Sequence, residues 1–331
     1  MTVEYFSNLA MVTSVVIYFL AFCMHAVEWA AVRKVKTTAE VGAADRALVG
    51  VGAGAGTDVA VGSGSGSEQV DPSPTNDNKL TPRQRMETFG RLGVAFTVIA
   101  WASSVASVIA RGIAADRWPL GNMYEFTTMA MVIIVAAYLV LAKMGMRWLG
   151  LPVTMLATIG NGLAVTVFYV AVAPLVPSLH SYWFVIHITA ASISGAAFNI
   201  GGVISILYLI KKRAERRGTV GGYLARLPES RRMDVVAYRV LAFAFPIWTF
   251  TIAAGAIWAQ YAWGRFWGWD PKEVWALVTW VIFACYLHAR ATAGWKGTRA
   301  AVIAIVGLAS FWFNFVGVNL LFSGLHSYAG I

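Results

Sequence analysis

The sequence predicts an all-α fold, a polytopic integral membrane helical bundle of about eight transmembrane helices with both termini outside. Hydrophobic residues make up 58% of the chain and charged residues 13%, about half the charged share of a soluble domain. The apolar runs are about twenty residues long and do not alternate, which is typical of spanning helices. Because lipid offers no hydrogen-bond partners, spans must be helices or a closed barrel.

The apolar runs divide the chain into a first helix, a linker and a seven-helix domain. Residues 1–36 hold the first helix, 37–88 form a Gly- and Ser-rich flexible cytoplasmic linker, and 89–331 hold the rest. The expected spans cover about 7–30, 89–111, 124–142, 151–173, 184 to the basic cluster at 211–217, 240–258, 272–287 and 301–322. Glycines within the fifth span, Gly195, Gly201 and Gly202, indicate close helix packing.

The basic residues set the orientation. The formal net charge is +10, but most of the 26 lysines and arginines fall in segments that share one side of the membrane. The four expected on the other side are Arg111, Arg117, Arg265 and Lys272. This positive-inside bias indicates topology and gives no reason to expect nucleic acid. Cys23 and Cys285 lie within apolar runs and form no CxxC pair, which excludes a disulfide scaffold, a zinc site and a thioredoxin-like centre.

A tryptophan-rich loop at 258–275 is the most unusual stretch. Six tryptophans flank the short polar sequence Asp270-Pro271-Lys272-Glu273: Trp258, Trp263, Trp267, Trp269, Trp275 and Trp280. Asp270 is expected to cap the next helix with Glu273 as its reciprocal partner, and Pro271 to open that helix. A membrane-interface belt needs only two or three such rings. The excess predicts a pocket for a flat aromatic ligand.

The topology sorts the five histidines by side, with His180, His187 and His326 at the outer face and His25 and His288 near the inner ends of their spans. A single such histidine is more often a packing residue than a ligand. His187 and His326, however, lie level with the tryptophan loop, and two neutral imidazoles across a flat pocket form an axial pair for haem iron.

His288 requires a separate explanation. It lies sixteen residues after Lys272, which is about 24 Å along a helix, so it cannot serve the outer site. It belongs to a second, inner site or is structural. His25, at similar depth, and a residue of another subunit are alternative partners for it.

These residues together resemble the CcsA/ResC family of cytochrome c biogenesis proteins, the membrane haem-handling component of the System II cytochrome c synthase. The resemblance covers about residue 89 to the C-terminus, and the segment at 50–78 has no counterpart in the family pattern. Its motifs are the WWD motif at 263–273, YLHAR at 286–290, YWFVIH at 182–187, GLHSY at 324–328 and WPLGNMYEF at 118–126.

The resemblance implies a haem site in this chain, with haem b as substrate and ligand. His187 and His326 would hold the outer haem iron, while Trp263, Trp267, Trp269 and Asp270 belong to the loop that covers it. His288 would ligate haem inside the membrane, with a second ligand from a ResB/CcsB-type subunit.

The implied activity is that of a holocytochrome c synthase component that works together with its partner. Haem is presented to the CxxCH motif of an apocytochrome c, whose thiols a thioredoxin-like pathway keeps reduced. No residue of this chain is expected to be catalytic, since thioether addition is the chemistry of haem and thiolate. The expected location is the plasma membrane of a bacterium, with the active face extracytoplasmic.

Three other classes of membrane protein share some of these features. A System I-like haem delivery protein shares a tryptophan-rich loop, but the span count and the motifs at 286–290 and 324–328 favour the present family. A membrane haem protein for electron transfer would bind haem stably and need no partner. A secondary transporter would show broken helices and internal repeats, and neither is evident in the sequence.

Overall fold

The computed structural model describes residues 2–51 and 81–326; for residues 31–51 and 82–83 it describes the backbone only. This part of the chain forms helices and no strand. Eight segments are long and apolar enough to cross a membrane, which confirms the all-α multi-pass fold. They are Val3–Ala30, Gln84–Ala115, Met123–Lys143, Arg147–Thr166, Tyr182–Arg216, Ser230–Trp263, Pro271–Ala291 and Thr298–Leu321. That both termini lie outside stays a prediction.

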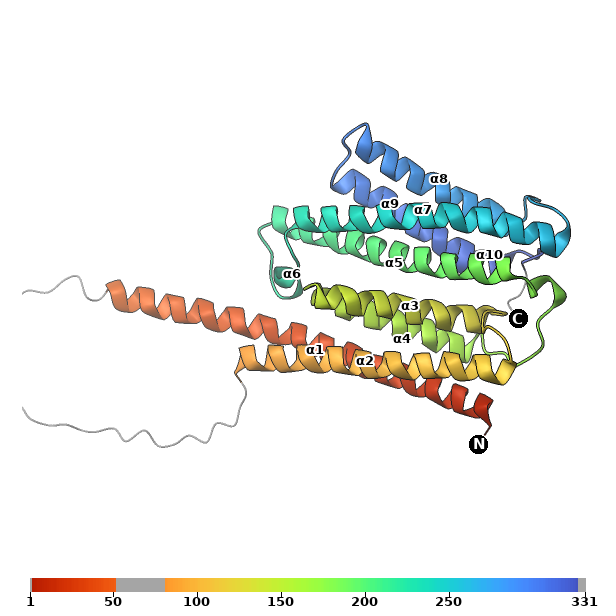
Figure 1. Ribbon diagram of the computed structural model, residues 1–331. Helices are drawn as coiled ribbons and strands as arrows, with labels where there is room; N and C mark the ends of the chain where they lie inside the picture. Colours follow the sequence, from red (N-terminus) through yellow and green to blue (C-terminus); the bar gives the residue numbers. More distant parts are fainter. Residues whose placement is uncertain (1, 52–80, 327–331) are drawn as a thin grey trace, which may run out of the picture.

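The helices run side by side as a bundle (Figure 1). Their bounds are α1 Val3–Val51, α2 Pro82–Ala115, α3 Met123–Lys143, α4 Gly150–Thr166, α5 Tyr182–Arg216, α6 Tyr223–Arg226, α7 Ser230–Trp263, α8 Pro271–Ala291, α9 Thr298–Trp312 and α10 Val318–Leu321. Short 3-10 turns lie at Arg147–Leu149 and Pro177–Leu179. The pair α1 and α2 lies on one side of the bundle, α8 and α9 lie on the other, and α5 is central between α3 and α7.

Both helices that flank the predicted linker extend into it. α1 continues to Val51, and α2 begins at Pro82. Thr81 caps α2: its hydroxyl oxygen accepts from the Gln84 backbone N–H at 3.3 Å, and the Gln84 side chain accepts from the Thr81 N–H at 2.9 Å. This capping box fixes the start of α2 at Pro82. Residues 52–80, the middle of the predicted linker, lie outside the described residues.

The fourth span is shorter than the sequence indicates. α4 ends at Thr166, and the chain then continues without helix up to Pro177. Side chains satisfy the backbone of this stretch: Arg111 donates to the carbonyl of Val170 at 2.6 Å, and Glu4 accepts from the N–H of Val172 at 3.0 Å. These contacts replace helical hydrogen bonds, so the apolar composition alone overestimates the length of the fourth helix.

The last span contains a turn of π-helix at Phe313–Gly317 between α9 and α10. Such turns are rare and recur at functional sites, because the extra residue per turn redirects side chains. No pattern in the sequence indicates this turn, since the apolar run is continuous from Thr298 to Leu321.

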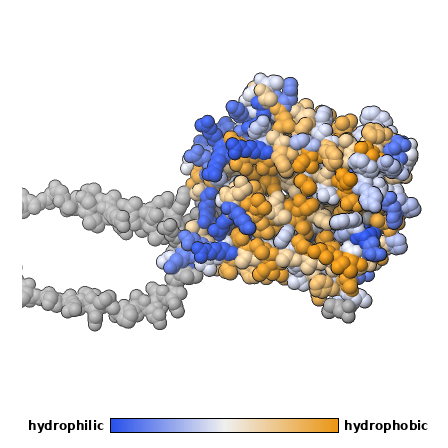
Figure 2. All heavy atoms as spheres, viewed as in Figure 1, coloured by the Kyte–Doolittle hydropathy of each residue, from blue (hydrophilic) through white to orange (hydrophobic). Residues whose placement is uncertain are grey.

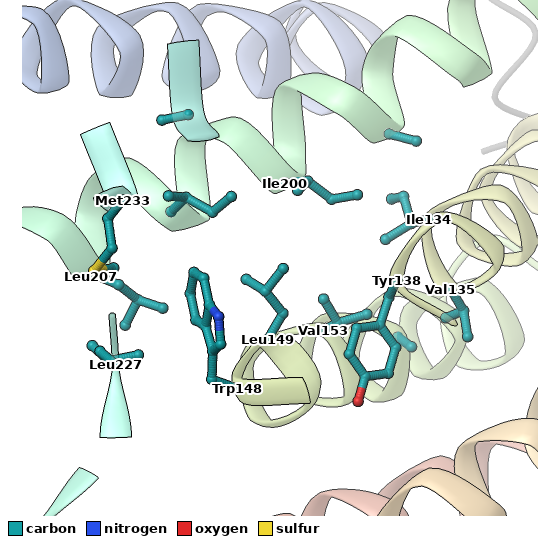
Figure 3. Close-up of a cluster of buried hydrophobic side chains, with 14 of the residues drawn as sticks. Ile134, Val135, Tyr138, Trp148, Leu149, Val153, Ile200, Leu207, Leu227 and Met233 are labelled. Carbon is teal, nitrogen blue, oxygen red and sulfur yellow. The ribbon is translucent and has the colours of Figure 1, made fainter. Parts of the chain in front are cut away.

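Close packing holds the bundle together. One buried cluster joins α3, α4, α5 and the start of α7 around Ile134, Leu149 and Ile200 (Figure 3). Lipid is as apolar as this core, so van der Waals packing and small residues, rather than the hydrophobic effect, bring the helices together. A Cβ at Gly195 would lie 2.6 Å from the Phe311 ring, which confirms the packing role predicted for the glycines of α5.

The surface divides into an apolar middle and two more polar ends (Figure 2). Hydrophilic side chains gather most densely at the end that carries the α5–α7 connection. The start of α1, the α7–α8 connection and the end of α10 all lie at the opposite end. The tryptophan-rich loop, the start of α1 and the end of α10 therefore share one end of the bundle, as the even number of described spans requires.

Candidate functional site

A cavity lies at the end of the bundle that carries the tryptophan-rich loop. It contains about 1130 Å³ of space, part of it open to the surroundings, and its walls are mostly apolar and aromatic. The loop before α3, the helices α5, α7 and α8, and the π-turn with α10 each contribute residues. A mostly apolar and aromatic lining with a few polar side chains is typical of a small-molecule site.

His187 lies on the second turn of α5 and lines this cavity. Its Nδ1 is 2.9 Å from the carbonyl oxygen of Thr251 on α7. Because a carbonyl can only accept, Nδ1 carries the hydrogen, and Nε2 of the neutral ring is left with its lone pair free. A close approach of α7 makes this arrangement possible, since a Cβ at Gly255 would lie 2.7 Å from the ring.

His326 lines the same cavity from the turn that follows α10. Its Nδ1 lies 2.9 Å from Oδ1 of Asp270, and the backbone N–H of Leu325 donates to Oδ2 of the same carboxylate at 2.9 Å. Nδ1 is therefore the donor here too, which leaves Nε2 as the free nitrogen in the neutral ring. Both predicted outer ligands thus have one ring nitrogen fixed and one available.

Trp258 connects the two histidines. Its indole is buried, and its ring centroid lies 5.8 Å from that of His187 and 5.5 Å from that of His326. The indole N–H donates to the carbonyl of Ser178 at 2.9 Å, which fixes the ring. The two imidazoles therefore lie against one shared indole, although they are far apart in the sequence.

The three tryptophans predicted for the site have different positions. Trp267 lines the cavity. Trp263 packs behind the wall against Trp258 and His326, with ring centroids 4.8 and 4.9 Å away. Trp269 is 69% exposed and has a φ of 58°, in the left-handed region that is uncommon for a bulky side chain. Only one of the three therefore contributes directly to the cavity surface.

The polar sequence at the start of α8 forms the predicted capping box. Asp270 accepts from the Lys272 N–H at 3.1 Å, and Glu273 accepts from the Asp270 N–H at 3.2 Å. Burial opposes ionisation of Asp270, but the hydrogen bonds from His326 and from two backbone N–H groups outweigh it and lower the pKa of the carboxyl to about 2. Asp270 therefore caps α8 and orients His326 as a carboxylate.

A buried ion network holds the loop that forms another wall. Glu125, with no exposed side-chain surface, accepts from Arg111 Nε at 3.0 Å and Arg117 Nη1 at 2.7 Å. It also accepts from the backbone N–H of Gly121 at 2.7 Å. Leu120 to Met123 of this loop line the cavity, so the network fixes their positions. In the sequence, both arginines indicated only topology.

Other cavity residues were missed by sequence reasoning. Trp248 and Phe311 lie among the buried aromatic residues below the histidines, and Asn314 lies on the π-turn. Trp248 and Phe311 have the spacing of ordinary core residues. Asn314 owes its position to the π-turn, which no sequence pattern indicated. Lys272 was counted only as an outer charge, although it also lines the cavity.

His180 and His288 lie outside the cavity, and both are exposed. His288 lies near the far end of α8, on the same face as Val281 and Cys285, which are exposed too. α8 is the least covered span of the described chain: 17% of its most apolar window is buried, against 72% for α5. The His288 face is therefore open to lipid or to another subunit.

His25 lies on the opposite side of the bundle from His288, so the structure does not bring the two together. Its ring is fully buried, and Cβ atoms placed on Gly93 or Gly150 would lie within 2.7 Å of it. Its Nδ1 lies 3.3 Å from Glu28, which in turn pairs with Arg226 at 2.6 Å. Among the described residues no group of three or more His, Cys, Asp or Glu side chains is placed to hold a metal ion.

The fold and the cavity define a class: a multi-pass membrane protein with a histidine- and tryptophan-lined site at one end of its bundle. The family model described as "Cytochrome C assembly protein" matches residues 96–326. The chain therefore belongs to the cytochrome c assembly protein family, and its function lies in cytochrome c biogenesis. The predicted family is confirmed, and the family makes apocytochrome c a partner.

Several curated relatives carry the description "Cytochrome c biogenesis protein CcsA". The protein of Chlamydomonas reinhardtii is 36% identical over 254 residues, which cover 75% of this chain and 68% of that protein. The protein of Gloeobacter violaceus is 33% identical over 298 residues, covering 74% and 88%. That of Synechococcus elongatus is 35% identical over 284 residues, covering 72% and 87%.

Among solved structures, "Cytochrome c Heme Lyase CcmF" is similar in fold. It aligns with a TM-score of 0.62 at 11% identity over 95% of this chain and 47% of that chain. This chain therefore spans about half the length of that protein, and the likeness is one of fold.

Proposed function

We propose that this chain binds haem in the cavity, and that Nε2 of His187 and Nε2 of His326 would hold its iron. The observation that carries this proposal is the matched hydrogen bonding of the two rings: each donates from Nδ1 at 2.9 Å, one to a carbonyl and one to a carboxylate. Metal-bound histidines usually donate their other ring N–H in this way, which fixes the tautomer and the ring plane. Trp267 and Trp258 supply aromatic surface beside the iron site.

The proposed activity is that of a haem lyase-type component of a holocytochrome c synthase. Each thiol of a CxxCH motif adds across one haem vinyl group: a C–S bond forms, the C=C π bond breaks, and the thiol proton ends on the neighbouring carbon. The addition consumes no external oxidant or reductant. The chain's part is to hold the haem in place, because fixed geometry removes much of the entropic barrier between two reactants.

A second subunit is part of the proposal. The exposed face of α8 around His288 suits a membrane partner of the ResB/CcsB type, which would supply the other ligand of an inner haem. A thioredoxin-like pathway would keep the apocytochrome thiols reduced, a task for which this sequence has no CxxC motif of its own. We place the protein in a bacterial plasma membrane with the cavity on the extracytoplasmic side.

The experiment is haem content and the optical spectrum of the purified full chain with its ResB-like partner, for wild type and single variants. We expect His187→Ala and His326→Ala to lose the same bis-histidine haem signal and to stop maturation of a reporter cytochrome c. His288→Ala should remove a different signal. His180→Ala is the matched control, because His180 is exposed and lies outside the cavity. Unchanged haem and maturation in both outer variants would refute the proposal.

Two other functions use the same site. A System I-like haem delivery protein would carry haem without supporting its attachment. An electron-transfer haem protein would keep its haem and leave cytochrome c maturation unaffected when deleted. The family membership favours biogenesis over electron transfer. Maturation of the reporter cytochrome in a deletion strain distinguishes biogenesis, in which maturation stops, from electron transfer, in which it continues.

A further inference from the structure

One lysine side chain faces the cavity, and the Asp270 carboxylate attracts its charge without forming a hydrogen bond or an ion pair with it. Lys272 is the second residue of α8, lines the cavity and is half-buried. Its ammonium forms no hydrogen bond or ion pair with the residues that the structure describes. An ammonium with three donors beside largely apolar walls is costly to leave unpaired, so its position needs a reason other than packing.

The two carboxylates that flank Lys272 in the sequence already have other donors. Glu273 accepts from Arg265 at 2.8 Å and from the backbone N–H of Gly268 at 2.9 Å. The two oxygens of Asp270 accept from His326, from the N–H of Leu325 and from the backbone of Lys272 itself. Neither carboxylate needs the Lys272 ammonium to be satisfied. The ammonium is therefore available for an acceptor that enters the cavity.

A second unsatisfied polar group lines the same cavity. Asn314 is 6% exposed, and its side-chain carbonyl oxygen is buried without a hydrogen-bond partner among the described residues. That oxygen can only accept, so it does not itself bind a carboxylate. The amide nitrogen of the same side chain carries two donors and forms no hydrogen bond with the described residues. The π-turn carries this residue, in a span whose surroundings are otherwise apolar and aromatic.

We infer that the Lys272 ammonium binds a carboxylate of the ligand that fills the cavity, with the Asn314 amide as a second donor. On the proposed function, which this inference deepens, that carboxylate is a haem propionate. Propionates occupy one edge of the porphyrin, and the vinyl groups lie away from them. Lys272 is then a positioning residue, because an anchored propionate edge decides which edge of the ring meets the thiols.

The test compares haemin with its dimethyl ester, in which both carboxylates are capped, by titration into the full chain. The variants are Lys272→Met, which keeps the length and removes the charge, and Lys272→Arg, which keeps the charge. Lys143→Met is the matched control, because Lys143 is exposed at the opposite end of α3. We expect wild type and Lys143→Met to bind haemin about tenfold to hundredfold more tightly than the diester.

Lys272→Met should lose this preference while it binds the diester as wild type does, and Lys272→Arg should keep most of it. A structural role for Lys272 would weaken both ligands equally. An unchanged preference in Lys272→Met would overturn the inference while leaving haem binding intact. If wild type binds neither compound, the proposed function falls together with the inference.

Discussion

His326 Nδ1 lies 2.9 Å from Asp270 Oδ1, and this hydrogen bond ties the end of the described chain to the first turn of α8. His187 uses a backbone carbonyl for the same purpose. A carboxylate raises the basicity of the imidazole that donates to it more than a neutral carbonyl does. The two proposed iron ligands would therefore differ in strength, with His326 the stronger donor.

The first prediction concerns Asp270→Asn. An amide oxygen still accepts from His326 but carries no charge, so we expect haem affinity at the outer site to fall about tenfold to hundredfold, the usual effect of changing a residue that orients a metal ligand. The measurement is haem titration of the full chain. Lys143→Met, remote from the cavity, should behave as wild type. An Asp270→Asn variant with wild-type affinity would show that the carboxylate only caps α8.

The lowered pKa of Asp270 predicts a pH dependence of stability. The pKa is about 2 in the folded chain against an ordinary 3.8, so the carboxylate contributes about 2 kcal/mol of stability that is complete above about pH 4. That contribution is lost as the pH falls from about 4 to 2. The melting temperatures of wild type and Asp270→Asn, measured in detergent across this range, should therefore converge at low pH. A constant difference between them would contradict the assignment.

Gly255→Ala should disturb His187 without removing it. The new Cβ would lie 2.7 Å from Cε1 and 2.8 Å from Nδ1 of the ring, so the ring must move away from the Thr251 carbonyl. We expect the bis-histidine haem signal to fall at least about tenfold. Gly162→Ala is the control, since its Cβ would meet no atom within 4 Å and should stabilise α4 by about 0.5 to 1 kcal/mol.

Sequence patterns predicted the fold well because membrane spans have a simple requirement. Length and apolar composition locate all eight spans, and the capping box at Asp270 and Glu273 is a local signal that the structure confirms. The end of α4 was misplaced, because distant side chains of Arg111 and Glu4 decide it. Composition does not record such contacts.

The site was predictable in part. The sequence placed His187 and His326 at one end of the bundle, and the structure brings them to one cavity. It placed Trp258 in the tryptophan-rich loop but did not indicate that this one ring contacts both histidines, because that contact depends on how α5, α7 and the turn after α10 pack. Nor did it indicate that Trp269 turns outward, since a left-handed backbone at tryptophan is rare.

Glu125→Gln should destabilise the loop that precedes α3. The buried carboxylate accepts from both Arg111 and Arg117, so removing its charge leaves one buried and one partly buried guanidinium group poorly paired. We expect a loss of about 3 to 5 kcal/mol and weaker haem binding, because the loop lines the cavity.

The measurements for Glu125→Gln are thermal unfolding and haem titration. Glu215→Gln is the matched control: Glu215 is partly exposed, it lies 3.9 Å from Lys211, and its loss should cost less than about 1 kcal/mol. Equal effects of the two substitutions would refute the special role of the buried network.

The last prediction is that His25 has a structural role and does not bind haem. Its ring is fully buried against Gly93 and Gly150, so it has no adjacent space for a flat macrocycle. Its contact with Glu28 instead orients the carboxylate that forms an ion pair with Arg226 and so joins α6 to α1. We therefore expect His25→Ala to lower the melting temperature while the optical spectrum of bound haem and cytochrome c maturation stay as in wild type, in contrast to His288→Ala. Loss of a haem band in His25→Ala, with the fold retained, would instead make His25 a ligand.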